Sequence, residues 1–194
     1  VIENTDSLKF FSKDIGPGNC LIDNWIRNNS SKKFDQNGTL ARRGMINEII
    51  LEQAQELFSN KPNSNYSLDT NDFDVSFARG LSLEDGAATL TNFTAKIISS
   101  AINESLKNEK KKSIEIIICG GGRKNSTLIE NIKINLKKNL FLKDINDYGI
   151  NGDFVESQAF AYLAIRSILG LPISFPSTTG CESPTTGGEI IKFK

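Results

Sequence analysis

The most informative absence in this chain is histidine, which does not occur among its 194 residues. Without an imidazole to accept a proton or bind a metal ion, these residues cannot form a Ser-His-Asp or Cys-His nucleophile system or a histidine-ligated metal site. Any acid–base chemistry in this chain must therefore be carried out by carboxylates.

Cysteine is nearly as scarce. Cys20, Cys119 and Cys181 are odd in number, lie far apart and show no CxxC spacing. The sequence therefore predicts neither a disulfide framework nor a zinc site, and we assign no metal ligands. Free thiols favour a reducing compartment, so we expect a cytoplasmic protein.

The chain also lacks an excess of one charge and any long apolar run. Its 23 basic and 23 acidic residues give a formal net charge of zero. Nucleic-acid-binding domains usually carry a basic excess, so we expect no nucleic-acid partner. The run Lys110 to Lys112 is interpreted as a solvated helix end before a strand. No apolar stretch approaches the roughly 20 residues of a membrane span, so we expect no membrane partner either.

The chain starts at Val1, and its single methionine is Met45. From this we expect a processed protein or a fragment of a longer one. Its length favours one domain, or one domain with a piece of another.

What is present is an alternation of strand and helix patterns. The run at 114–118 is almost continuously apolar, which is typical of a strand buried on both faces of a parallel sheet. A strand of this kind between helices predicts an α/β domain. We expect strands at 8–11 and 114–118, and helices at 20–28, 46–58, 83–101, 126–136 and 153–169.

Local signals refine these elements. Ser82 with Asp85 predicts a capping box at the start of the third helix. The spacing in the second helix predicts a buried stripe of Ile46, Ile49, Ile50, Ala54 and Leu57. Residues 59–79 have little periodicity and are expected to form a surface loop that touches a ligand or partner. The tail at 174–188 is expected to be an ordered loop or an edge element.

The first candidate site is Asp14 followed by Gly16-Pro17-Gly18-Asn19, at the start of a predicted helix. Glycines let a ligand approach the backbone, a helix N-terminus favours an anion, and the carboxylate could remove a proton. The alternative is that these residues form only a turn.

The second candidate is Gly120-Gly121-Gly122, followed by Asn125, after the strand at 114–118. Successive glycines at this place allow a flat group such as a purine to lie against the backbone. The sequence is neither GxGxxG nor GxxxxGK, so the Rossmann and P-loop interpretations lack their defining residues. A tight strand-to-helix turn is the alternative.

The third candidate is the pair Asp153 and Glu156. Asp153 is expected to cap the helix that follows, and Glu156 lies one turn inside it. Acidic residues are common in first turns because they interact favourably with the helix dipole, so the spacing leaves the role of Glu156 open.

Together these segments resemble the anhydro-N-acetylmuramic acid kinase family. The resemblance extends along the whole chain, and its motifs keep the family's order. The carrying residues are Asp14-Ile15-Gly16-Pro17-Gly18-Asn19-Cys20-Leu21-Ile22-Asp23, Gly80-Leu81-Ser82-Leu83-Glu84-Asp85, Gly120-Gly121-Gly122-Arg123-Lys124-Asn125, Gly152-Asp153-Phe154-Val155-Glu156 and Pro176-Ser177-Thr178-Thr179-Gly180.

The resemblance implies an α/β, ribonuclease-H-like lobe of the sugar kinase, Hsp70 and actin superfamily. It further implies that residues 1–194 are the carboxy-terminal lobe of a two-lobed kinase. The amino-terminal lobe, with its glycine-rich phosphate hairpin, would be the missing partner. Family members are commonly dimers, so a homodimer is also possible by the same resemblance.

The implied reaction uses ATP and Mg²⁺ to phosphorylate the 6-oxygen of 1,6-anhydro-N-acetylmuramic acid while water opens the anhydro bridge. Its product, N-acetylmuramic acid 6-phosphate, belongs to peptidoglycan recycling. By this resemblance Asp14 is the catalytic base for the water and Glu156 binds the sugar, while Gly16, Gly18 and Asn19 shape the substrate loop. The resemblance assigns contact with the adenosine part of ATP to Gly120, Gly121, Gly122 and Asn125, and the cleft or hinge to residues 80–85.

Two departures from the family pattern weaken particular contacts. Ile15 stands where the family usually has threonine, and residues 63–70 lack the usual Pro-Lys-Ser element. Two other functions stay open, of which the first is favoured by the missing phosphate hairpins. One is a nucleotide-binding or interaction module that is inactive as an isolated fragment, and the other is a different sugar kinase of the same superfamily.

Overall fold

The structure is a computed structural model that describes residues 2–3, 9–59 and 72–191. The chain divides into two compact units. The larger unit is Ile15–Gly152, and the smaller unit combines residues 1–14 with 153–194.

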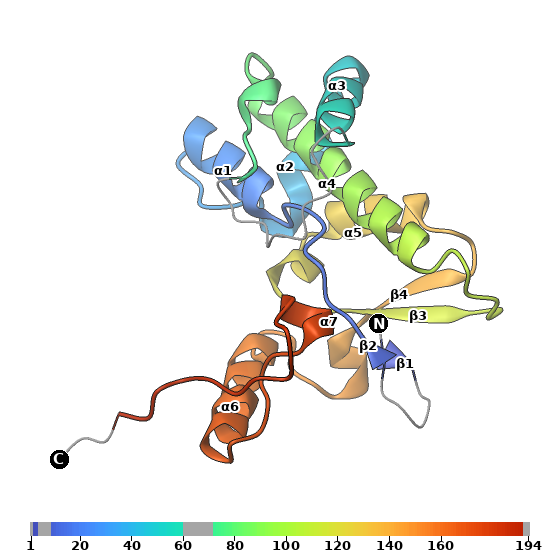
Figure 1. Cartoon of the computed structure of the whole chain (residues 1–194). Coiled ribbons are helices and arrows are strands. Elements are labelled where there is room, and N and C mark those ends of the chain that lie inside the picture. Colours follow the sequence, from blue (N-terminus) through green and yellow to red (C-terminus); the bar gives the residue numbers. More distant parts are fainter. Residues whose placement is uncertain (1, 4–8, 60–71, 192–194) are drawn as a thin grey trace. The chain divides into compact units, whose positions relative to one another are not determined.

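The larger unit is built around the helix α4 (Leu83–Ser105), which contacts α1, α2, α3 and α5 (Figure 1). A parallel pair, β3 with β4, joins Ile114 to Leu140 and Ile118 to Asp144 in register. The other elements of this unit are α1 (Cys20–Asn29), α2 (Thr39–Arg43), α3 (Glu48–Ser59), β3 (Ile114–Ile118), α5 (Ser126–Asn135) and β4 (Leu140–Asp144), with short 3-10 helices at Gln36–Gly38, Ser76–Ala78, Gly121–Lys124 and Ile145–Tyr148.

The smaller unit contains the antiparallel pair β1 (Ile2–Glu3) and β2 (Lys9–Phe10), and the helices α6 (Val155–Ile168) and α7 (Pro176–Thr179). The Phe10 and Phe175 rings meet edge to face with centroids 5.1 Å apart. An isolated bridge pairs Ser174 with Thr185, and residues 180–184 and 186–188 form a loop, in agreement with the predicted ordered loop. The helix α7 was not predicted.

The start of α4 is fixed by hydrogen bonds and by one close packing contact. Ser82 Oγ accepts a hydrogen bond from the Asp85 backbone N–H at 3.1 Å, which confirms the predicted cap. The Asp85 carboxylate does not complete the capping box. It accepts a hydrogen bond from the Met45 backbone N–H at 2.7 Å, which holds the loop before α3 against the start of α4. Gly86 leaves room for the Trp25 ring, because a Cβ at position 86 would lie 2.2 Å from Trp25 Cε2.

The main hydrophobic core lies where α1, α2 and α3 meet α4. Trp25 anchors it, and the Trp25 Nε1–H donates to the Leu83 carbonyl oxygen at 2.9 Å. A second buried cluster of Ala95, Leu128 and Ile132 packs α5 on α4. The buried members of the main core are Leu21, Ile22, Trp25, Ile26, Leu40, Ala41, Leu51, Ala54, Ala78, Ala87, Leu90, Phe93 and Ile97.

The predicted buried stripe of α3 is largely wrong. The helix begins at Glu48 rather than Ile46, and Asn47 Oδ1 accepts from the Ile50 backbone N–H. Leu51 is fully buried, whereas Ile49 and Leu57 are 70% and 68% exposed. Both faces of α3 carry apolar residues at helical spacing, so the spacing could not show which face would pack on α4.

The expected surface loop at 59–79 is confirmed only in part. Residues 73–75 are irregular and Asp74 and Arg79 are exposed, but Ser76–Ala78 form a 3-10 helix and the segment also packs on the core. Contact with a ligand or partner stays a prediction.

Phe73, Val75 and Phe77 pack against the main core, and the Phe77 ring lies 5.3 Å from that of Phe93. Aromatic side chains bury large apolar areas, and here they hold the segment down. Residues 60–71 lie outside the described part of the chain.

Burial alternates along β3, which corrects the expectation of a strand covered on both faces. Ile114, Ile116 and Ile118 are partly buried, but Ile117 is 52% exposed. The neighbouring strand β4 carries charges at Lys143 and Asp144, which weakened its sequence signal. The predicted strand at 8–11 is confirmed for Lys9–Phe10 only. The helices predicted at 20–28, 126–136 and 153–169 are confirmed, although α6 begins at Val155 rather than Asp153.

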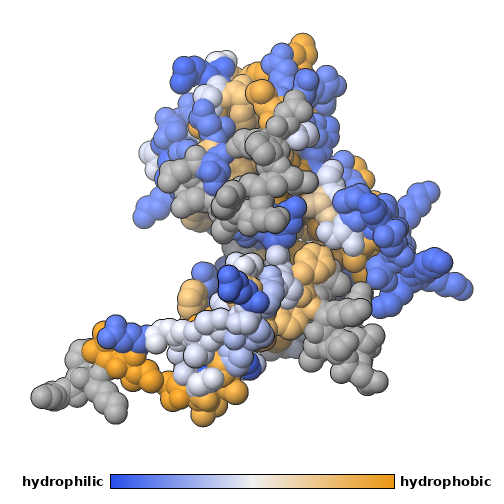
Figure 2. Space-filling view, viewed as in Figure 1, coloured by the Kyte–Doolittle hydropathy of each residue, from blue (hydrophilic) through white to orange (hydrophobic). Residues whose placement is uncertain are grey.

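The interpretation of the lysine run is confirmed for its exposure but wrong for the helix end, because α4 ends at Ser105 and residues 109–111 are irregular. Lys110, Lys111 and Lys112 are all exposed, at the hydrophilic end of β3 and α4 (Figure 2). No helix within the described residues is long and apolar enough to cross a membrane.

The packing of α3 can be tested by two leucine substitutions. Leu51→Ala should lower the free energy of unfolding by about 2–5 kcal/mol, because it empties a fully buried site. Leu57→Ala, on the exposed face, should change it by less than about 0.5 kcal/mol. Urea unfolding of the 194-residue chain measures both, and equal losses would contradict the observed orientation of α3.

Candidate functional site

The turn before α1 uses its two glycines for different reasons. Gly18 has φ +54°, which favours a residue without a side chain, whereas a Cβ at Gly16 would lie 2.8 Å from Ile97 Cγ2 on α4. The Cys20 backbone N–H donates to the Pro17 carbonyl oxygen and starts the helix. Backbone conformation therefore explains the glycine at position 18, and close packing against Ile97 explains the glycine at position 16.

The triple-glycine turn follows β3 and presents bare backbone. Gly120 has φ +78°, and a Cβ at either Gly120 or Gly121 would have no atom within 4 Å. Packing therefore does not require glycine at position 121. The carboxyl ends of parallel strands are the usual ligand-binding edge of an α/β sheet, and this turn lies at that edge.

The two glycine turns meet within the larger unit. A Cβ at Gly122 would lie 3.6 Å from Asn19 Oδ1, so the Asn19 side chain rests against the triple-glycine turn. Asn19 Oδ1 is buried and accepts no hydrogen bond from any described residue. Buried polar atoms are nearly always paired, so this oxygen is suited to accept a hydrogen bond from a ligand.

Asn125 has a structural role in addition to the predicted one. The Asn125 Oδ1 atom accepts from the Leu128 backbone N–H at 3.0 Å and caps α5. The loop at Gly38 lies directly on this cap, and Thr127 Oγ1 donates to the Gly38 carbonyl oxygen at 2.7 Å. Contact of Asn125 with a nucleotide stays a prediction.

Asp14 and Glu156 both belong to the smaller unit, and both are exposed. The segment before Asp14 is held by Ser12, whose backbone N–H and Oγ–H donate to the Ser177 and Thr178 carbonyl oxygens at 3.1 and 3.0 Å. Glu156 lies in the first turn of α6. The roles predicted for the two carboxylates remain predictions.

The predicted cap of α6 is wrong. The N-cap residue is Phe154, which makes no side-chain cap hydrogen bond, so Asp153 lies outside the helix. No residue of α6 is buried, and its apolar side chains Phe160, Ile165 and Ile168 are 66%, 57% and 65% exposed (Figure 2).

One further ionisable group emerges only from the structure. Burial raises the pKa of the Asp23 carboxyl in α1, with Asp35 adding to the rise and Arg27 opposing it. A perturbed carboxyl beside a candidate turn is a functional candidate, although ion-pair networks perturb pKa values too. In the sequence, Asp23 stands three residues after Cys20 in the glycine-turn motif. This position alone does not indicate that its carboxyl is buried.

The described residues include no group of three or more cysteine, aspartate or glutamate side chains that could together hold a metal ion.

The Asp23 pKa leads to a prediction about stability and pH. The pKa of Asp23 in the folded chain exceeds its value in the unfolded chain, which is ordinarily about 3.9. The free energy of unfolding therefore falls as the pH rises from the unfolded pKa through the folded one. Asp23→Asn should therefore stabilise the chain at neutral pH, and the gain should disappear below the ordinary aspartate pKa. Thermal unfolding across pH measures this.

Asp74→Asn is the matched control for this prediction. Hydrogen bonds from Ser76 lower the Asp74 pKa, so its contribution is present above the unfolded pKa and is lost as the pH falls through the folded one. This substitution should destabilise the chain at neutral pH. A change of the same sign and size for both variants at every pH would contradict the account.

Comparison with known proteins gives a consistent result along the chain. The family model described as anhydro-N-acetylmuramic acid kinase matches residues 4–192. The curated protein of that name from Pelagibacter ubique is 50% identical over 193 residues, which cover 99% of this chain and 51% of that protein. Those from Zymomonas mobilis and Caulobacter vibrioides are 39% and 38% identical over 91% and 97% of this chain, and 47% and 48% of their own length.

The chain thus spans about half the length of the curated relatives it matches. The family match covers nearly all of the chain and includes both glycine turns and both carboxylates. This chain belongs to the anhydro-N-acetylmuramic acid kinase family.

Proposed function

We propose that this chain is the carboxy-terminal half of a two-lobed, ATP-dependent kinase, with a ribonuclease-H-like lobe as its fold. The 51% coverage of the Pelagibacter relative supports a chain of about half the kinase, and the parallel strands that lead into a glycine turn support the fold. The choice of the carboxy-terminal half rests on the motif resemblance. The partner would be the amino-terminal half, which supplies the remaining phosphate contacts.

The reaction we propose for the whole protein is hydrolytic opening of 1,6-anhydro-N-acetylmuramic acid with phosphorylation of its 6-oxygen. The product is N-acetylmuramic acid 6-phosphate, formed in the cytoplasm during peptidoglycan recycling. The observation that carries this proposal is the family match over residues 4–192. In the anhydro sugar the 6-oxygen is part of the bridge, so its phosphorylation requires that water break the bond at C1.

Asp14 is the proposed general base for this water. Its carboxylate is exposed, so water and sugar can reach it, and the chain offers no histidine for the task. A positioned base contributes typically about 10²–10⁴-fold to a rate. Glu156 is the proposed sugar ligand, since an exposed carboxylate in a first helical turn can accept hydrogen bonds from sugar hydroxyls.

The proposed nucleotide site is the pair of glycine turns in the larger unit. Gly120 and Gly121 present backbone to open space, against which the adenosine part of ATP can lie. The buried Asn19 Oδ1 can accept a hydrogen bond from a nucleotide N–H or O–H group. Gly16 and Gly18 hold the Asn19 turn, and Mg²⁺ would reach the site bound to the phosphates, where it neutralises their charge.

The first test is an assay of the full-length protein that contains this chain, with ATP, Mg²⁺ and the anhydro sugar. The account expects sugar-dependent consumption of ATP and a phosphorylated product with a free C1 hydroxyl. Phosphorylation of another sugar but not of this one would favour a different sugar kinase. Nucleotide binding without any transfer would favour an inactive module.

Asp14→Asn in the full-length protein should lower kcat by at least roughly 100-fold and leave ATP affinity unchanged, because it removes the base and keeps the shape. Steady-state kinetics and nucleotide titration measure the two effects. Asp147→Asn, which removes an exposed carboxylate of the larger unit, serves as the control. An unchanged kcat would remove Asp14 from its assignment.

Glu156→Ala should raise KM for the sugar by roughly tenfold or more and leave KM for ATP nearly unchanged. The loss of one hydrogen bond to a charged group, about 1.5–3 kcal/mol, accounts for this size. Glu182→Ala, another exposed glutamate of the smaller unit, is the control. Equal rises in both KM values would contradict a sugar-specific role.

A further inference from the structure

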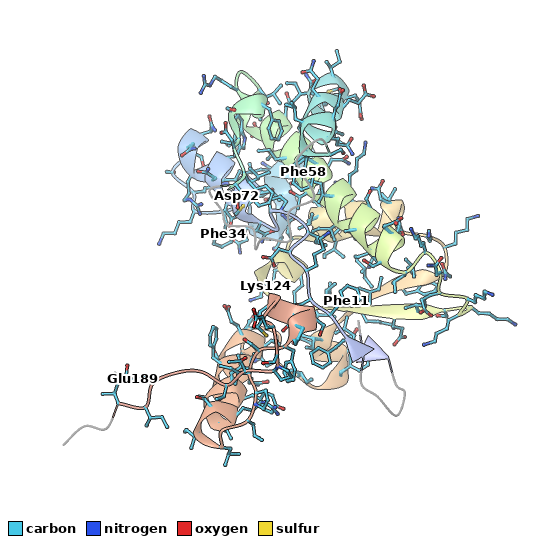
Figure 3. All side chains as sticks on the ribbon, in the orientation of Figure 1. Phe11, Phe34, Phe58, Asp72, Lys124 and Glu189 are labelled. Atoms are coloured by element: carbon cyan, nitrogen blue, oxygen red, sulfur yellow. The ribbon has the colours of Figure 1, made fainter. Side chains whose placement is uncertain are left out.

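The Arg123 side chain is almost completely buried, although it belongs to the triple-glycine motif and carries a charge. Its exposed fraction is 4%, whereas Lys124, the next residue, is exposed (Figure 3). Arg123 Nη1–H donates to the Gly120 carbonyl oxygen at 3.0 Å, and Nε lies 3.5 Å from Asp144 Oδ2. The guanidinium thus joins the turn after β3 to the end of β4.

This side chain reinforces the turn at Gly120, where the backbone hydrogen bond is long, whereas the Asn125 backbone N–H donates to the Gly122 carbonyl oxygen at 3.0 Å. The Arg123 backbone N–H reaches the Gly120 carbonyl oxygen at 3.4 Å, which is long for such a bond. The guanidinium donates to the same oxygen from a shorter distance, and a hydrogen bond from a charged donor is stronger than a neutral one. A Cβ at Gly120 or Gly121 would have no atom within 4 Å, so no neighbouring side chain closes over these two positions.

A third segment closes around the guanidinium. A Cβ at Gly152 would lie 2.6 Å from Arg123 Nε and 2.8 Å from Cζ, so only glycine leaves room for the cation. Asn146 fixes this segment, because its Oδ1 accepts from the Gly152 backbone N–H and its own N–H donates to Asp144 Oδ1, both at 2.9 Å. In the sequence, Gly152 stands four residues before Glu156.

We propose that Arg123 is a positioning residue for nucleotide binding: it fixes the Gly120–Gly122 backbone in the conformation that receives ATP, with Asp144 and Gly152 as its supports. The proposal deepens the proposed function and rests on the assignment of this turn to the nucleotide. Its physical basis is that a bare glycine backbone has many conformations, and a ligand that must select one of them loses affinity.

The test compares Arg123→Lys and Arg123→Met in the full-length protein. Lysine keeps the charge, but its single ammonium lacks the planar guanidinium that contacts the Gly120 carbonyl oxygen and the Asp144 carboxylate together. Methionine removes both contacts. KM for ATP and the dissociation constant for ATP without sugar should rise by roughly 10- to 100-fold for methionine, the size expected of a misplaced binding group, and by less for lysine. KM for the sugar should change by less than twofold.

Lys143→Met is the matched control, because it removes an exposed cation from β4 beside Asp144. It should leave every constant within about twofold of wild type, since exposed lysines contribute little. If Arg123→Met does not fold, judged by its thermal transition, then Arg123→Lys and Asp144→Asn decide the question by the same binding measurement.

A double-substitution cycle separates positioning from general stability. Gly152→Ala pushes its methyl group into the guanidinium and should weaken ATP binding by a similar factor. If the two positions act through one contact, the combination Gly152→Ala with Arg123→Met should bind ATP no more weakly than the worse single variant. If the loss of ATP affinity in the double variant equals the product of the two single losses, the two positions act independently and the shared mechanism is wrong.

The failure of this proposal differs from the failure of the proposed function. If wild type phosphorylates the anhydro sugar while folded Arg123 variants bind ATP normally, the positioning role is wrong and the function stands. Equal losses in the constants for ATP and sugar would also overturn the positioning role. If wild type binds ATP but transfers no phosphoryl group, the function fails, and the binding constants still decide the role of Arg123.

Discussion

Close backbone approach to α4 is the constraint on which the larger unit depends. Gly86 lets the Trp25 ring lie on the helix, and Gly44 lets the chain before α3 pass beside it, since a Cβ there would lie 2.0 Å from the Glu84 carbonyl oxygen. Ala87, Leu90 and Phe93 then complete a core that α1, α2 and α3 share. Larger side chains at the two glycines would separate these elements and open cavities that such a core tolerates poorly.

The same helix brings the two glycine turns together. Gly16 packs on Ile97 of α4, which fixes the turn before α1, and α5 packs on Ala95 of α4 directly after the triple-glycine turn. Asn19 and Gly122 are neighbours as a result. The candidate nucleotide groups belong to the larger unit and the candidate catalytic carboxylates to the smaller one.

Much of this architecture could be predicted from the sequence where local chemistry is decisive. The Ser82 cap and the helices at 20–28 and 126–136 depend on a few neighbouring residues, and the structure bears them out. The face of α3, the packing of Phe73 and Phe77, and the pairing of β4 depend on tertiary partners that periodicity does not specify. The motif resemblance indicated which residues to examine, but the burial of Arg123 and of Asn19 Oδ1 required coordinates.

The central claim is that one protein containing this chain couples bridge opening to phosphoryl transfer. Mass spectrometry of the product formed by the full-length protein from ATP and the anhydro sugar tests it most directly. The account predicts a product that has gained one phosphoryl group and the elements of one water molecule. A product that carries the phosphoryl group without the added water, or a sugar that remains unchanged while ATP is consumed, would contradict it.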